Sequence, residues 1–381
     1  MSHHVVGHVV APPATIGMLG GGQLGRYALI AGRRMGYGTV VLEPDTRAPA
    51  GAVADEHLMA AYDDEAALDR LAAVCAVVTT EFENPPAVSL ERLERSTTVA
   101  PSAAAVAIAQ DRRTEKRFLA ATGIPVAPWG VVESDADRPD VGFPAILKTA
   151  QLGYDGKGQT AIASIDRISD AWTALGGAAC VLERAMELET EVSVVVARTA
   201  DGRTATYEVS ENHHVDGVLD LTVVPARVAG SVAARATEIA AAVADALDYV
   251  GVLAVELFVV DGQLYVNELA PRPHNSGHWT LDAARTSQFE QQVRAVCGMG
   301  LGATAMTTPA VAMVNLLGDL WQRGEPDWAI ALAAPRASLH LYGKAVARPG
   351  RKMGHLTVTG DSAGDVAAKA CELRHAIRRS R

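Results

Sequence analysis

Short apolar runs alternate with amphipathic segments through the N-terminal quarter of the chain. The runs are rich in β-branched residues, and the segments between them repeat apolar residues at helical spacing. This alternation predicts βαβ units and therefore a parallel sheet. The expected strands are 14–19, 39–42 and 76–80, and the expected helices are 23–35 and 65–74.

The pattern changes at Asp111, which is a good helix N-cap. A helix is expected from there to Thr122, closed by Gly123, and residues 135–139 read as a loop. Short strands without long helices between them then predict an antiparallel α+β body. The expected strands are 145–149, 160–162, 181–183, 191–197, 206–209, 310–315 and 338–342, and the expected helices are 235–247 and 287–297.

Two apolar runs flank Asp261-Gly262, a dipeptide that favours a tight hairpin turn. Glu256 interrupts the first run and Glu268 the second. A carboxylate in an apolar strand is costly unless a cation compensates it, and two of them suggest an oxygen-liganded ion such as Mg²⁺. Surface carboxylates on an exposed sheet face are the alternative.

The register of this hairpin decides whether the two carboxylates meet. A two-residue loop sets Glu256 opposite Asn267 and leaves Glu268 on the other face. A three-residue loop or a bulge pairs Val260 with Leu264 and sets Glu256 opposite Glu268. We predict the second arrangement.

Length and charge restrict the classes of protein. At 381 residues the chain exceeds one hydrophobic core, and 49% apolar with 20% charged residues describes a soluble globular protein. No apolar run reaches a membrane span, and the start lacks the features of a secretory signal, so a cytoplasmic protein is expected. The net charge of −10 argues against a nucleic-acid surface.

Cysteines, tail histidines and the basic end have simple interpretations. Cys75, Cys180, Cys297 and Cys371 have no metal-site spacing and are expected to be buried free thiols. His3, His4 and His8 could chelate a metal, but a frayed tail is the simpler interpretation. The basic ending from Arg374 to Arg381 is expected to be a solvated helix end.

Two glycine-rich loops are candidates for anion binding. Residues 20–25 fit GxGxxG between a strand and a helix, and Glu43 ends the next strand, as in NAD-binding folds. Another anionic ligand or a tight turn would use the same loop. Residues 153–159 join two strands, so their amides could close over phosphates as a flap, with Lys148 beneath them. A plain hairpin turn with a surface lysine is the alternative.

Together these features resemble the ATP-grasp ligases. The motifs of that family occur here in the same order and at the same spacing: Lys148, the 153–159 loop, the 183–186 segment, Glu191 and the Glu256…Glu268 pair. Within that group the chain resembles the 5-(carboxyamino)imidazole ribonucleotide synthases. Seven segments carry this likeness: 20–26, 80–84, 110–112, 153–158, 210–214, 267–279 and 348–352. The resemblance covers residues 15–356 and is most specific at 267–279. An extra N-terminal tail and a short last segment depart from it.

The resemblance implies an α/β and α+β fold of five parts. These are an N-terminal tail (1–14), a Rossmann-like parallel-sheet substrate domain (15–105), a central lid subdomain (106–185), an ATP-grasp C-terminal subdomain (186–300) and a small mixed α+β C-terminal domain (301–381).

An ATP site with Mg²⁺ is implied by the same resemblance. Arg112 and Lys148 would contact phosphates, Glu183 and Met186 would meet the adenine, and Glu191 would accept a ribose hydroxyl. Glu256 and Glu268 would hold Mg²⁺. The full implied ATP set is Arg112, Lys148, Gly153, Tyr154, Asp155, Gly156, Lys157, Gly158, Gln159, Glu183, Arg184, Ala185, Met186, Glu191, His214, Asn267 and Glu268.

A second set would bind 5-aminoimidazole ribonucleotide and bicarbonate, and the first glycine loop would serve this substrate rather than NAD. The set is Gly22, Gln23, Leu24, Glu81, Glu83, Arg272, His274, Asn275, Lys344, Arg351 and Lys352. Catalytic roles are implied for Arg272, His274, Asp155 and Lys344. A homodimer and transient hand-off of the product to a mutase are also implied.

The implied reaction is ATP-dependent carboxylation of an amine through carboxyphosphate. Three rivals remain: another ATP-grasp ligase differing around residues 272–279, an NAD-dependent oxidoreductase built on the first glycine loop, and a regulatory protein with an inactive nucleotide site. The last is disfavoured because Lys148, Glu256 and Glu268 are all present.

Overall fold

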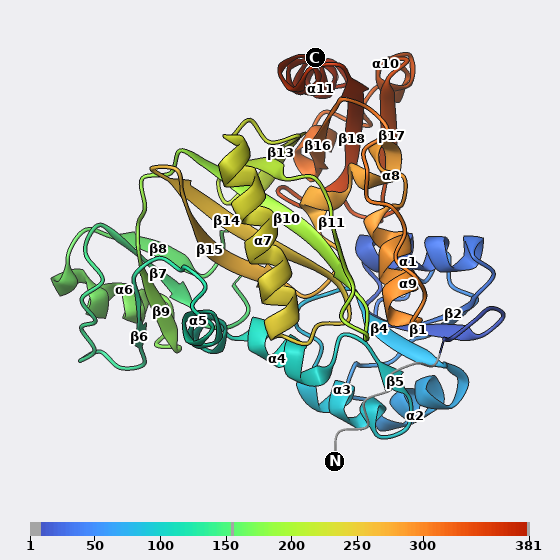
Figure 1. Cartoon of the computed structure of the whole chain (residues 1–381), viewed down its shortest axis with the longest axis horizontal. Coiled ribbons are helices and arrows are strands. Elements are labelled where there is room, and N and C mark those ends of the chain that lie inside the picture. Colours follow the sequence, from blue (N-terminus) through green and yellow to red (C-terminus); the bar gives the residue numbers. More distant parts are fainter. Residues whose placement is uncertain (1–8, 154–155, 379–381) are drawn as a thin grey trace.

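The computed structural model describes residues 9–153 and 156–378, which form three sheets flanked by helices (Figure 1). His3, His4 and His8 of the tail, Tyr154 and Asp155 of the second glycine loop, and the last three residues lie outside the described residues. The predicted succession of a parallel sheet and antiparallel bodies is confirmed.

The first sheet is parallel throughout, with strand order β3-β2-β1-β4-β5. All the strands and helices predicted here are confirmed within one or two residues at their ends, and β3 and β5 are additional short edge strands. The elements are β1 (Thr15–Leu19), α1 (Gln23–Arg34), β2 (Gly38–Leu42), β3 (Glu56–Leu58), α2 (Glu65–Val74), β4 (Val77–Thr80), α3 (Ala87–Glu94), β5 (Thr98–Val99) and α4 (Ala103–Gln110).

The second sheet is antiparallel, in the order β6-β9-β7-β8. The Asp111 side chain caps α5 by accepting a hydrogen bond from the Arg113 amide, and Gly123 follows the helix with a φ of +72°, as the sequence predicts. The elements are α5 (Arg112–Ala121), β6 (Trp129–Val132), β7 (Ala145–Thr149), β8 (Gln159–Ile162), η1 (Ile165–Arg167), α6 (Ile168–Ala174) and β9 (Cys180–Arg184).

The third sheet has nine strands, in the order β15-β14-β10-β12-β13-β16-β18-β17, with β11 beside β10. The C-terminal segment therefore extends this sheet rather than forming one of its own, because β16 pairs with β13. The strands are β10 (Thr190–Arg198), β11 (Thr204–Thr206), β12 (Ser210–Val215), β13 (Val218–Val224), β14 (Gly251–Val260), β15 (Gln263–Ala270), β16 (Ala310–Leu317), β17 (Ala337–Leu341) and β18 (Lys352–Gly360).

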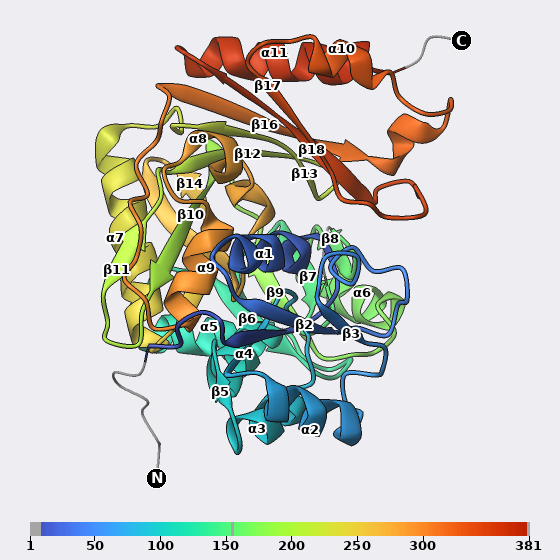
Figure 2. The same ribbon diagram turned by 90° about the vertical axis from the view of Figure 1, so that its right-hand side faces the viewer.

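Helices cover this large sheet and join it to the parallel sheet. Gln292 on α9 makes the link, because its amide group donates to Thr79 of β4 at 2.8 Å and accepts from the Val252 amide of β14 at 2.6 Å. Figure 2 shows α1 between the parallel sheet and the C-terminal strands. The helices are α7 (Gly230–Ala246), η2 (Asn275–Gly277), α8 (Thr280–Ala283), α9 (Gln288–Val296), η3 (Gly318–Trp321), α10 (Trp328–Leu332) and α11 (Ala363–Ala376).

The carboxylate hairpin, β14 and β15, has the predicted pairing of Glu256 with Glu268 but reaches it differently. Val260 pairs with Gln263, so the loop is the two-residue turn and the predicted Val260–Leu264 pairing is wrong. A bulge lies between Glu256 and Leu257, and Asn267 is the extra residue on the facing strand that brings Glu268 opposite Glu256. The bulge lies beside the carboxylates and not at the turn.

Three other expectations need correction. The strand predicted at 206–209 is wrong: β11 ends at Thr206, and the alternating apolar residues Tyr207 and Val209 are buried by tertiary packing instead. All four cysteines are free thiols, but Cys371 is only half-buried. Arg374 is not a solvated helix end, because its guanidinium forms an ion pair with Asp220 of β13.

Candidate active site

A cleft of about 670 Å³ lies where the three sheets meet. The loops after β1 and β4 form one side, the second glycine loop and the β12–β13 turn form another, and the β14–β15 hairpin with the 344–352 loop completes it. Its lining includes these predicted site residues: Gln23, Leu24, Glu81, Glu83, Gly153, Lys157, His214, Glu256, Glu268, Arg272, His274, Asn275, Lys344, Arg351 and Lys352.

Two carboxylates of the chain itself accept the hydrogen bonds that the amides of the first glycine loop donate. Glu81 accepts hydrogen bonds from the amides of Gly22 at 2.9 Å and Gly25 at 3.1 Å, and Glu43 accepts from the Gly21 amide at 2.7 Å. Glu43 also accepts from the Tyr62 hydroxyl at 2.5 Å. Because the donors that a pyrophosphate would need are already used, this geometry argues against the dinucleotide interpretation.

Glu81 is buried at the floor of the cleft. Burial raises the pKa of its carboxyl group, although the two glycine amides and the charges of Arg272 and Lys344 act in the opposite direction. Glu83, two residues further on, points to Arg272 and forms an ion pair with it. The two acidic residues predicted after the third strand therefore have different roles. Glu81 is buried and accepts from the glycine-loop amides, whereas Glu83 pairs with Arg272 of the cleft.

Beneath the hairpin, Lys148 and Lys116 both lie 3.3 Å from the same carboxylate oxygen of Glu183. Burial alone would raise the pKa of Glu183, but the lysines and Arg112 outweigh it and lower the pKa to about 2. Lys148 also donates to the Asn267 side chain at 3.3 Å. Glu183 is only 2% exposed and its Oε2 atom holds both lysines, and its contact with the adenine stays a prediction.

Two residues of α5 belong to this polar cluster and were not predicted. Lys116 is fully buried and donates to the backbone carbonyl of Asn267 at 2.9 Å. Glu115 accepts from the Leu269 amide at 3.2 Å, and burial raises its pKa to about 8. A helical i, i+3 and i, i+4 relation to Arg112 was the available signal for both, since such residues share a helix face.

The two candidate metal ligands each have a basic neighbour. His274 Nε2 lies 3.0 Å from Glu256 Oε1, and Arg112 Nη1 lies 2.9 Å from Glu268 Oε2. Both carboxylates line the cleft from adjacent strands, and Glu256 is only 9% exposed. Paired carboxylate oxygens on adjacent strands match the oxygen donors that Mg²⁺ requires, so the residues fit this ion.

At the cleft end of β10 and β12, Glu191 and His214 lie together, with His214 Nδ1 3.1 Å from Glu191 Oε2. Burial lowers the pKa of His214, but the hydrogen bond and the charge of Glu191 exceed that effect and raise it overall. The two residues predicted for the nucleotide site are thus neighbours, although only His214 lines the cleft.

Basic residues form the side of the cleft nearest the C-terminal segment. Lys344 Nζ donates to the Lys352 carbonyl at 2.8 Å, and Arg351 Nη1 donates to the Val346 carbonyl at 2.9 Å, so the 344–352 loop is held by its own side chains. Arg348 lines the same wall and was named only as part of a motif. Several cations around one cleft favour an anionic ligand.

Some predicted residues lie behind or beside the cleft. Lys148 and Glu183 lie beneath the hairpin, and Asn267 is the bulge residue of the hairpin that accepts from Lys148. Gly22 donates its amide hydrogen to Glu81, and Arg112 lines a small adjoining pocket. The remainder do not line the cleft in this structure: Gly156, Gly158, Gln159, Arg184, Ala185, Met186 and Glu191. Phe82, Asn84 and residues 217–219 line it without having been predicted as site residues.

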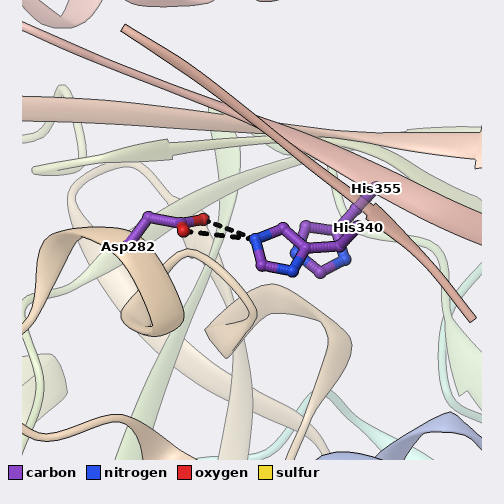
Figure 3. A group of neighbouring side chains, drawn as sticks. All are labelled: Asp282, His340 and His355. Carbon is purple, nitrogen blue, oxygen red and sulfur yellow. Dashed lines mark hydrogen bonds and ion pairs between the residues drawn. The ribbon is translucent and has the colours of Figure 1, made fainter. Parts of the chain in front are cut away.

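A histidine cluster lies next to the cleft and joins α8 to β17 and β18 (Figure 3). Asp282, His340 and His355 bring ligand-type atoms within 4.8 Å of one another. His340 Nε2 is already 2.9 Å from Asp282, and the two imidazoles stack with centroids 4.4 Å apart and planes at 12°. Parallel rings do not direct their lone pairs at a common point, so this arrangement is a packing contact between the C-terminal segment and α8.

Three family models match the chain in order. A ribonucleotide synthetase preATP-grasp domain matches residues 13–110, an ATP-grasp domain matches 117–289, and a phosphoribosylaminoimidazole carboxylase C-terminal domain matches 311–369. Fold and cleft therefore define an ATP-grasp ligase. The chain is 46% identical over 353 residues to the N5-carboxyaminoimidazole ribonucleotide synthase of Brucella melitensis, across 91% of this chain and 96% of the relative. It belongs to the N5-carboxyaminoimidazole ribonucleotide synthase family.

Solved structures agree with this assignment. An ADP complex of an N5-carboxyaminoimidazole ribonucleotide synthetase superposes with a TM-score of 0.90 at 40% identity, covering 97% of this chain and 98% of that one. The Aspergillus clavatus N5-carboxyaminoimidazole synthase, in complex with ADP and 5-aminoimidazole ribonucleotide, gives 0.85 at 29% identity, covering 96% and 99%. Within the described ranges, no helix is both long and apolar enough to span a membrane.

Proposed function

We propose that this enzyme carboxylates the exocyclic amine of 5-aminoimidazole ribonucleotide, using ATP and bicarbonate, and so makes N5-carboxyaminoimidazole ribonucleotide for purine biosynthesis. One observation carries the proposal: a single cleft joins the glycine loop and Glu81 to the carboxylate hairpin and the second glycine loop. A ribonucleotide and a nucleoside triphosphate bound on these two sides would meet in its middle. The Aspergillus clavatus relative holds ADP and this ribonucleotide together.

The ATP side would use the hairpin and the residues beneath it. Lys148 and Arg112 would contact phosphates, with Glu183 and Asn267 holding Lys148 in place. The second glycine loop would close over the phosphates, while the 184–186 segment, Glu191 and His214 would meet the nucleoside. Glu256 and Glu268 would hold Mg²⁺, which neutralises charge on the phosphates during transfer.

The first chemical step would join bicarbonate to phosphate. A bicarbonate oxygen attacks the γ-phosphorus, the bond from phosphorus to the bridging oxygen of ADP breaks, and carboxyphosphate forms. Phosphoryl transfer needs positioning and charge neutralisation more than covalent help, which the cationic Lys148 and Arg112 supply. The covering loop would exclude water from the mixed anhydride.

The second step would transfer the carboxyl carbon to the amine. Carboxyphosphate releases CO₂ and phosphate in the closed cleft, the amine nitrogen bonds to the carbon, and the nitrogen loses one proton to the released phosphate. Arg272, set by Glu83, would hold the anionic carbon species, and Gln23, Leu24 and Glu81 would contact the ribonucleotide. Its phosphate would lie against the basic wall of Lys344, Arg351 and Lys352.

Three further proposals concern organisation. The domain boundaries are those set out from the sequence, with the large sheet shared across the last of them. A homodimer is proposed, as is transient transfer of the product to a mutase.

The test is ADP release from Mg-ATP and bicarbonate, with and without 5-aminoimidazole ribonucleotide. We expect the ribonucleotide to stimulate release strongly, and the stimulation to disappear when bicarbonate is removed. E268Q should abolish release, whereas E238Q, on the exposed face of α7, should not change it. Turnover that ignores the ribonucleotide would point to another acceptor and overturn the proposal.

A further inference from the structure

Behind the cleft, His274 is the outer member of a buried chain of hydrogen bonds. Its Nδ1 atom lies 2.9 Å from Ser276 Oγ, which lies 2.7 Å from Ser193 Oγ. Ser193 Oγ in turn lies 2.8 Å from Asn212 Nδ2, and Asn212 Oδ1 lies 3.0 Å from Thr222 Oγ1. The four residues behind His274 are at most 6% exposed, so the chain is shielded from water.

The fold fixes the members of this chain next to one another. Asn212 on β12 pairs directly with Thr222 on β13, and Ser193 on β10 pairs directly with Glu256 on β14. Ser276 comes from the short helix η2, which begins immediately after His274. Three neighbouring strands and one tight turn therefore set these distances.

One backbone amide sets the direction of every hydrogen bond in the chain. The Ser276 amide donates to His274 Nδ1 at 3.3 Å, and an amide N–H can only donate. Nδ1 is therefore an acceptor and carries no hydrogen. The Ser276 hydroxyl must also donate to Nδ1, so its oxygen accepts from Ser193, and Ser193 accepts from the amide group of Asn212.

The same reasoning assigns the other ring nitrogen. A neutral imidazole without hydrogen on Nδ1 carries it on Nε2, and Nε2 lies 3.0 Å from Glu256 Oε1. His274 thus presents an N–H donor to a cleft carboxylate. In the opposite tautomer the Nδ1–H group would face the Ser276 backbone N–H group. Two donors would then oppose each other with no acceptor between them.

We infer that Ser276, Ser193, Asn212 and Thr222 are positioning residues that hold His274 as the Nε2–H tautomer. In this form His274 orients Glu256 and cannot take the amine proton at Nε2, because that atom already bears hydrogen. Partners behind a cleft histidine commonly fix its tautomer in this way. The inference deepens the proposed function and rests on it for the role of Glu256, but the tautomer itself can be measured without turnover.

The test is ¹⁵N NMR of the full-length protein labelled at histidine, with the His274 signals assigned by loss in H274Q. We expect Nδ1 to resonate as an unprotonated nitrogen and Nε2 as a protonated one at neutral pH. In S276A the preference should weaken, because one of the two donors to Nδ1 is lost while the backbone amide of residue 276 remains. The matched control is S210A, since Ser210 is equally buried, pairs with Ser193 across the strands and accepts a hydrogen bond from Trp279, but lies outside the chain.

Activity provides a second readout that simple loss of packing would not reproduce. S276A should lower kcat roughly 10-fold to 100-fold with KM for ATP unchanged, as removal of such a supporting partner commonly does, whereas S210A should not. S193T, which keeps a hydroxyl in the chain, should retain the wild-type tautomer. A protonated Nδ1 in the wild-type protein, or a share of the Nε2–H tautomer that S276A does not lower, would overturn the inference. If the protein showed no ribonucleotide-dependent turnover but kept the Nε2–H tautomer, only the proposed function would fail.

Discussion

Lys148 and Lys116 share one carboxylate oxygen of Glu183, each at 3.3 Å, beneath the candidate phosphate site. The two lysines come from β7 and α5, and Glu183 comes from β9 between them. One buried anion therefore holds a cation near the position where triphosphate charge would lie.

Removing that anion should destabilise the protein. In E183Q two lysines would remain buried without their counter-ion, and we expect the free energy of unfolding to fall by about 3 kcal/mol, as for other broken buried ion pairs. K148M should cost less stability but weaken ATP binding. Urea unfolding followed by ATP titration separates the two effects, and an E183Q protein as stable as the wild type would contradict this account.

The close contact between Gly22 and Glu81 predicts that a larger residue at position 22 weakens ribonucleotide binding. A Cβ at Gly22 would lie 2.6 Å from Glu81 Oε1, too close to be accommodated without moving the carboxylate. G22A should raise KM for the ribonucleotide by about tenfold or more, equivalent to at least 1.4 kcal/mol, and leave KM for ATP unchanged. G230A is the control, because open space surrounds that position. An equal rise in both KM values would show that the loop serves ATP as well.

Glu115 should make stability depend on pH. Its pKa is raised to about 8 in the folded state, so between pH 4.5 and 8 the unfolded chain has lost a proton that the folded chain keeps. Stability from this group is therefore lost as pH rises through that range, by at most about 5 kcal/mol. E115Q lacks the titration, so without Mg²⁺ its stability relative to the wild type should improve from pH 5 to pH 8. E238Q should show no such trend.

Local patterns were sufficient to predict much of the fold. Apolar periodicity and caps located β1, α2, α5 and β7 because each is decided by neighbours in the sequence. The strand expected at 206–209 failed because Tyr207 and Val209 alternate like a strand but are buried by tertiary packing. Sheet continuity from β13 to β16 could not be predicted, since it joins segments far apart in the chain.

Site residues were predicted where a motif lies in one continuous segment of the sequence. They were missed where folding brings separate segments together. The 267–275 segment and the glycine loops were found directly. Lys116 and Glu115 carry no motif, and their importance appears only when α5 packs against β9 and β15. The position of the bulge at Asn267 also required the structure, because either loop length was compatible with the turn residues.

The most direct measurement of the central claim follows oxygen from bicarbonate. With ¹⁸O-labelled bicarbonate, Mg-ATP and 5-aminoimidazole ribonucleotide, attack on the γ-phosphorus should leave one bicarbonate oxygen in each phosphate released. Phosphate carrying that label, formed in step with ADP and absent with E268Q, is the result this account predicts. Phosphate whose new oxygen came from water would contradict it, because ATP would then be hydrolysed without forming carboxyphosphate.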